Sequence, residues 1–114
     1  MPVLAIASHI PSTEIGLGFF QETHPTKIFE ECSDFCELVT SPKQMPGVLH
    51  RALRTAIGRN TVSVIVIPGD VTMMEFDGDT PDFVLPSPVR RVPVESDVTA
   101  AADLLNGSGN ITIL

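Results

Sequence analysis

The chain has 114 residues and a mass of 12.2 kDa, which suits one small domain and is too little for a self-contained two-domain enzyme. Its 43% hydrophobic residues disfavour intrinsic disorder, and its net charge of -7 argues against binding to nucleic acid, because no basic surface is available for the phosphates. No apolar run approaches the ~20 residues of a membrane span and no export signal begins the chain, so we expect a cytoplasmic protein.

The N-terminal part predicts a strand followed by a long loop. Residues 3–8 read VLAIAS, an apolar run without alternation that is typical of a strand covered on both faces of a parallel sheet. Pro11, Gly16 and Gly18 predict a loop rather than a tight hairpin, and this loop carries the tetrapeptide FFQE at positions 19–22.

The next elements alternate between helix and strand. Apolar residues at helical spacing predict a helix over about residues 25–35, and the sequence CELV at 36–39 indicates a short strand. The pattern SPKQ at 41–44 resembles a capping box, and Pro46 then requires a kink or a second helix start. A periodic apolar face over 48–57 predicts the most regular helix, which we expect to end near Gly58.

Residues 62–67 read VSVIVI, which predicts a second doubly buried strand, closed by the sequence PGD. The alternation of strands and helices therefore indicates an α/β fold with a parallel sheet. After Val71 the chain becomes rich in proline, which indicates a linker or a strap over residues 72–94. A helix capped by Ser96 and a strand over 110–114 then resemble the opening of a second α/β domain, so we expect the chain to be a fragment.

Several motifs resemble known sites of chemistry. The sequence GLGFFQ at 16–21 lacks the third glycine of a dinucleotide-binding loop. His24, Cys32 and Cys36 supply three of the four ligands of a closed zinc site, and a half-buried helix face is the preferred interpretation, so no metal-binding residue is predicted. The three histidines have no nucleophile at a recognisable spacing, which gives a hydrolytic triad no support. The two cysteines fit a reducing compartment.

The loop after the first strand remains the best candidate site. In open parallel sheets ligands bind beyond the carboxyl ends of the strands, and this loop leaves such an end with Phe20 and Gln21. A phenylalanine ring excludes water, and a glutamine amide holds a carboxylate or carbonyl oxygen without adding charge. The alternative is an aromatic plug over the sheet edge.

Longer stretches resemble a known family. The run VLAIASHIPSTEIG at 3–16, the sequence FFQETHP at 19–25 and the segment CSDFCELV at 32–39 are similar to the thiamine-diphosphate-dependent pyruvate oxidases, most of all to the quinone-reducing pyruvate dehydrogenase branch. The sequences QMPGVLHRAL at 44–53 and VSVIVIPGDV at 62–71 resemble the last helix and strand of that family's pyrimidine-binding domain.

The resemblance implies a domain plan and a set of cofactors. Residues 1–71 would be the C-terminal half of the pyrimidine-binding domain, 72–94 the linker, and 95–114 the first helix and strand of a central FAD-binding domain. The intact enzyme would use thiamine diphosphate, Mg²⁺ and FAD. The family's activating glutamate and its Gly-Asp-Gly motif for the metal and the diphosphate are both missing here.

The resemblance also implies residue roles and partners. Phe20 and Gln21 fall on the loop that lines the pyruvate pocket, and Glu22 stands behind them. The parent enzyme would oxidise pyruvate to acetate and carbon dioxide, pass electrons to a quinone, and form a homotetramer with sites between subunits. It would touch the inner face of the plasma membrane at most peripherally, through parts absent from this chain.

Two other functions stay open. The sequences FQE and IPxDV are shared with acetolactate synthases, so a carboligase fragment is the nearest alternative. A free-standing α/β module that pairs with another chain through an exposed sheet edge is the second. In the leading interpretation, this chain alone is inactive.

Overall fold

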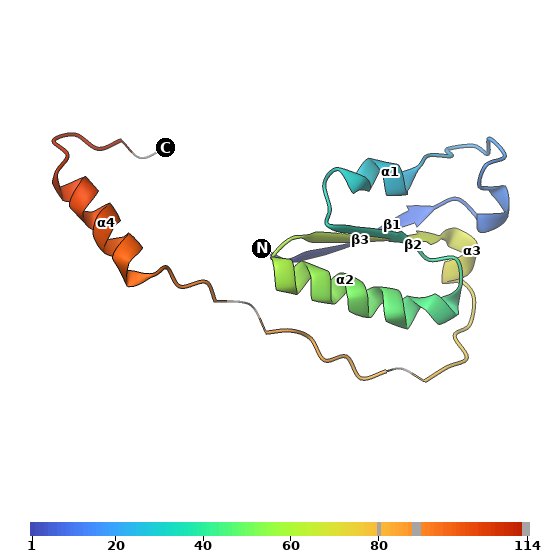
Figure 1. The fold of residues 1–114 in the computed structure, drawn as a ribbon. Coiled ribbons are helices and arrows are strands. Elements are labelled where there is room, and N and C mark those ends of the chain that lie inside the picture. Colours follow the sequence, from blue (N-terminus) through green and yellow to red (C-terminus); the bar gives the residue numbers. More distant parts are fainter. Residues whose placement is uncertain (80, 88–89, 113–114) are drawn as a thin grey trace.

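The computed structural model describes residues 1–79, 81–87 and 90–112. Within them a three-stranded parallel sheet has the order β1-β3-β2, formed by β1 (Val3–His9), β2 (Phe35–Leu38) and β3 (Val62–Pro68). The helices α1 (Pro25–Glu30) and α2 (Met45–Arg59) lie on opposite faces of this sheet (Figure 1). The predicted α/β fold with a parallel sheet is thus confirmed.

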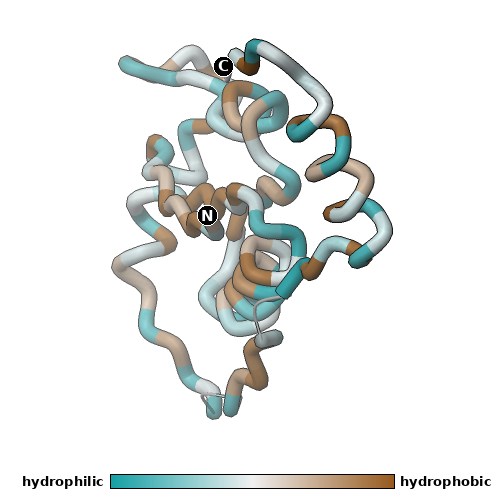
Figure 2. The backbone as a smooth tube through the Cα atoms, turned by 90° about the vertical axis from the view of Figure 1, so that its left-hand side faces the viewer, coloured by the Kyte–Doolittle hydropathy of each residue, from teal (hydrophilic) through white to brown (hydrophobic). Residues whose placement is uncertain are grey.

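The core surrounds the central strand β3. Ile65 at its middle is fully buried and packs with Phe35, Val39, Ala52 and Val71 from the surrounding elements. Figure 2 shows hydrophobic segments close to the N-terminus in the middle of the view, with further ones distributed over the outer coils. The predicted double coverage of the strand at 62–67 is confirmed, because neighbours on both edges and helices on both faces exclude water from β3.

The same expectation is wrong for β1. This strand pairs only with β3 among the described strands, and its Ile6 is 63% exposed although Ile65, directly opposite in the register, is 0% exposed. Val3 is exposed as well. An apolar run without alternation therefore predicted the strand correctly and its burial incorrectly, because position at the sheet edge decides burial.

The first helix is shorter than the sequence predicts. It ends at Glu30, and the Ser33 hydroxyl then donates to the carbonyl of Phe29 at 2.6 Å in the turn toward β2. Cys32 lies in that turn and Cys36 lies in β2, so the two cysteines do not share one helix face.

The capping box expected at 41–44 does not form, because the Gln44 side chain bonds the residue before Ser41 rather than Ser41 itself. The Gln44 side chain accepts a hydrogen bond from the Thr40 backbone N–H at 2.9 Å, but the Ser41 hydroxyl makes no capping bond. Residues Pro42–Gln44 form a short 3-10 helix (η2), after which Pro46 stands in the first turn of α2 as a second helix start. The helix ends one residue beyond Gly58, with Asn60 in the left-handed conformation at φ 57°.

Two short elements lie at the carboxyl end of the sheet. A 3-10 helix, η1 (Ser12–Glu14), follows β1, and α3 (Gly69–Thr72) follows β3. Their adjacency is fixed by Asp70, whose carboxylate accepts the Ser12 backbone N–H at 2.7 Å and the Ser12 hydroxyl at 2.5 Å. The exits of the two parallel strands are thus joined.

The C-terminal part does not pack on the sheet. The helix α4 (Glu95–Asn106) lies apart from the other elements (Figure 1), and none of its residues, all of which are described, has a buried side chain. The radius of gyration of 21.3 Å exceeds the roughly 13 Å of a compact domain of this length. Val94, not Ser96, precedes the helix as its N-cap.

The predicted strand at 110–114 stays a prediction. Residues 110–112 have no regular secondary structure, and 113 and 114 lie outside the described residues. In the part of the chain that the structure describes, no helix has both the length and the apolar character needed to cross a bilayer.

Candidate functional site

The loop between β1 and α1 is held in an unusual backbone conformation. Gly16 and Gly18 have positive φ angles of 88° and 73°, and Gln21 follows with φ 63°. No helix starts within residues 16–21, which excludes the dinucleotide-binding arrangement for this glycine pair. The loop instead folds back toward the end of β1.

This loop and the end of β1 line an open cavity of about 410 Å³. Phe19, Phe20 and Gln21 line it from the loop, and Ser8 and His9 line it from the strand. Ile10, Pro11 and Thr23 complete the lining. The cavity therefore lies beyond the carboxyl end of a parallel strand, where open α/β sheets bind ligands.

The two phenylalanines do not plug the sheet edge. Phe20 is 80% exposed and Phe19 is 44% exposed, whereas a plug would bury its ring against the strands. An aromatic ring kept largely in water has no hydrophobic reason to occupy that position. The plug alternative is therefore wrong, and the rings remain free to cover a bound molecule.

The lining carries no carboxylate, lysine or arginine. The Gln21 amide can donate and accept hydrogen bonds, as can the hydroxyls of Ser8 and Thr23. His9 Nδ1 accepts a hydrogen bond from the backbone N–H of Ile10 at 2.9 Å, which fixes the imidazole ring of His9 at the carboxyl end of β1. Such a wall suits a small polar molecule whose oxygens need hydrogen bonds and whose reaction benefits from little water.

Two carboxylates hold the loop at its ends. Asp70 binds Ser12 at the start, and the hydrogen bond from the Ser12 hydroxyl is the main reason that the pKa of Asp70 lies below its usual range. Glu22 binds the backbone near the end, and the hydrogen bond from the Gly16 N–H is the main reason that the pKa of Glu22 is also lowered. Both side chains are charged at neutral pH.

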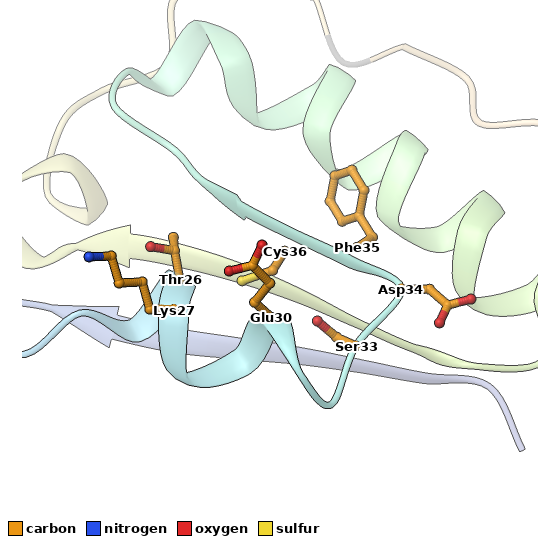
Figure 3. Close-up of a pocket in the computed structure, with 7 residues that line it drawn as sticks. All are labelled: Thr26, Lys27, Glu30, Ser33, Asp34, Phe35 and Cys36. Atoms are coloured by element: carbon orange, nitrogen blue, oxygen red, sulfur yellow. The ribbon is translucent and has the colours of Figure 1, made fainter.

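A second cavity, of about 300 Å³, lies between α1 and β2 (Figure 3). Its side chains diverge: Phe35 points toward α2, and Lys27 and Asp34 lie at opposite ends of the view. Burial, followed by the charge of Glu37, raises the pKa of the Cys36 thiol, which keeps it protonated and poorly nucleophilic. This cavity therefore offers no convergent set of reactive groups.

Comparisons with known proteins support the relation suggested by the sequence. No family model matches the chain. It is 53% identical over 117 residues to an uncharacterized 42.6 kDa protein in the isoamylase 3' region of Pseudomonas amyloderamosa, which covers 100% of this chain and 29% of that protein. It is 37% identical over 70 residues, 61% of this chain, to the putative thiamine pyrophosphate-containing protein YdaP of Bacillus subtilis.

A third relative is the pyruvate oxidase of Lactiplantibacillus plantarum, with 26% identity over 106 residues and 91% of this chain covered. The chain spans 29%, 12% and 17% of the lengths of these three relatives, less than a third in each case. Together the similarities support a thiamine-diphosphate-dependent enzyme family. They do not extend to the quinone-reducing branch.

Phe20 and Gln21 both line the cavity, whereas Glu22 is outside the lining and binds the backbone of the same loop, so their roles toward a substrate stay predictions. It does not assemble the metal candidates: in residues 1–79, 81–87 and 90–112 no group of three or more His, Cys, Asp or Glu side chains could hold an ion. Sequence reasoning missed His9 as a lining residue. The signal that identifies it is its place at the carboxyl end of the first strand, because that end faces the ligand in parallel sheets.

Proposed function

We propose that this chain supplies one wall of the active site of a longer, cytoplasmic thiamine-diphosphate-dependent enzyme that oxidises pyruvate. In the proposed reaction, pyruvate, water and a quinone give acetate, carbon dioxide and the quinol. The observation that carries the proposal is the cavity at the end of β1, which Phe20 and Gln21 line and whose lining has no carboxylate, lysine or arginine. The similarity to a pyruvate oxidase over most of the chain supports the choice of substrate.

The described residues fit the uncharged part of such a site. The aromatic rings and the Gln21 amide suit contact with a heteroaromatic ring and with pyruvate oxygens. They do not fit the charged end, since the described residues offer no metal-binding cluster for Mg²⁺ and a diphosphate. The proposal therefore assigns the metal, the diphosphate and FAD to other parts of the longer protein.

When bound, thiamine diphosphate supplies the electron sink that decarboxylation requires. The contribution of this chain is to bind and orient pyruvate and to exclude water. The Gln21 N–H donates to a substrate oxygen without placing a charge beside the carboxylate, and the Phe20 ring keeps water away. Loss of charge as carbon dioxide leaves is favoured where water is scarce.

The test uses the complete protein that carries this chain, supplied with thiamine diphosphate, Mg²⁺ and FAD. We expect turnover of pyruvate with ferricyanide as electron acceptor, with acetate as the product. Gln21→Glu should lower kcat/KM by about 10²-fold, because it sets a negative charge against the substrate carboxylate. Gln44→Glu, an amide outside the cavity, should leave it unchanged.

Three outcomes oppose the proposal. Acetolactate as the main product would assign the chain to the carboligases instead. Equal effects of the Gln21 and Gln44 variants would remove the cavity from the reaction. Turnover by the 114-residue chain alone would contradict the assignment of the charged groups to other parts.

A further inference from the structure

Glu22 binds the loop that precedes it. One carboxylate oxygen accepts the Gly16 N–H at 2.5 Å, and the other accepts the N–H groups of Gly18 at 2.8 Å and Phe19 at 3.2 Å. The backbone N–H of Glu22 donates to the carbonyl of Phe19 at 2.9 Å. The Glu22 side chain thus links the two ends of the segment 16–22, which carries Phe20 and Gln21.

The backbone conformation explains why three N–H groups converge. Gly16 and Gly18 have positive φ angles, and the N–H groups of Gly16, Gly18 and Phe19 point to one side and form a concave site for an anion, whereas the Leu17 N–H donates to the Glu14 carbonyl at 3.2 Å. No atom lies within 4 Å of a Cβ built at either glycine, so space would allow a side chain. Glycine is favoured there by the backbone conformation alone, because L-residues with side chains rarely adopt it.

The charge of Glu22 is needed for this arrangement. The backbone hydrogen bonds from Gly16, Gly18 and Phe19 lower the pKa of Glu22, with a smaller contribution from the charge of His24, whereas desolvation opposes them. An ionised carboxylate offers acceptor sites on both oxygens, and hydrogen bonds to it are stronger than those to a neutral acceptor. A protonated Glu22 would lose acceptor capacity on one oxygen and the charge that strengthens all three bonds.

We propose that Glu22 is the positioning residue of this site: its carboxylate holds residues 16–22 in the conformation that presents Phe20 and Gln21 to the cavity, and proton uptake releases the loop. The role of the loop in pyruvate turnover rests on the function proposed above. The existence of the carboxylate clamp does not, so the two can be tested separately.

The clamp is tested on the full 114-residue chain by amide NMR from neutral pH to about pH 3, below the ordinary pKa of a glutamate. We expect the amide protons of Gly16, Gly18 and Phe19 to shift together, with one midpoint below that ordinary value. Glu22→Gln should abolish the shared titration and speed exchange of these amides about fivefold, the factor of a typical net hydrogen-bond contribution. The control Glu14→Gln, on the same loop, should leave both unchanged.

Three results would each overturn the clamp. The three amides could titrate separately, they could titrate in Glu22→Gln as in the parent chain, or they could show no hydrogen-bonded shifts at neutral pH. The positioning role is tested on the complete enzyme. In the parent enzyme, kcat/KM should fall at low pH with the same midpoint as the NMR titration, and Glu22→Gln should remove this fall. A confirmed clamp without any effect on turnover would refute the positioning role and leave the clamp standing. A complete enzyme that does not oxidise pyruvate refutes the proposed function instead.

Discussion

Two isoleucines that face each other in the sheet give a direct test of the fold. Ile6 of β1 and Ile65 of β3 are partners in the parallel register, yet Ile65 is 0% exposed and Ile6 is 63% exposed. Truncation to alanine removes three carbons from each side chain. At about 0.8 kcal/mol per buried methylene, Ile65→Ala loses about 2.4 kcal/mol of transfer free energy, and the cavity that it leaves brings the cost to about 3–5 kcal/mol.

The same arithmetic gives a small effect at the edge. Roughly a third of the Ile6 side chain is removed from water, so Ile6→Ala should cost only about 0.9 kcal/mol, with no cavity because solvent fills the space. The free energy of unfolding is measured by urea titration, followed by far-UV circular dichroism because the chain has no Trp or Tyr. Equal losses in the two variants, at unchanged dependence on urea, would refute the assignment of β1 as an open edge.

Three further predictions concern the loop and the linker. Asp70→Asn should abolish the acid titration of the Ser12 amide, because the Asp70 carboxylate accepts that N–H. The pKa of Asp70 is lowered in the folded chain. The stabilising effect of Asp70 is therefore present above the ordinary aspartate range and is lost as pH falls through the lowered value. Gln21→Val should disorder the loop, measured as faster amide exchange at 16–22, because a β-branched residue is disfavoured at φ 63° even more than the unbranched glutamine. Phe83→Ala should expose the linker to limited proteolysis, because the ring of Phe83 stacks on His50 of α2 at 5.4 Å between centroids.

Each of these has a matched control. Asp103→Asn, on the separate helix α4, should leave the Ser12 titration intact, and a loss in both variants would assign that titration to another group. Gln21→Asn should be tolerated because asparagine adopts the left-handed region readily, so disorder in Asn and Val variants alike would refute backbone strain as the cause. Val84→Ala changes a neighbour that is 82% exposed, and equal cleavage in it would show that Phe83 does not anchor the linker.

The candidate site was predicted from the sequence only in part. The sequence predicted a ligand site in the loop after the first apolar strand, where aromatic and amide side chains stand at 19–21. The cavity lies at this loop. The lining by His9 needs the position of the strand end, and the binding of Glu22 to three N–H groups needs the positive φ angles of Gly16 and Gly18. Those angles depend on the folded path of the loop, which no periodicity encodes.

The sequence by itself determined the longer strands and helices. The short apolar runs at 3–8 and 62–67 specify strands, and the periodic apolar face at 48–57 specifies the helix α2. Tertiary structure decided that β3 is central and β1 an open edge, that Asp70 joins the exits of both strands, and that α4 stays apart. The physical reason is that burial and hydrogen-bond partners depend on neighbours distant in the chain, whereas a local pattern reports only the residues within it.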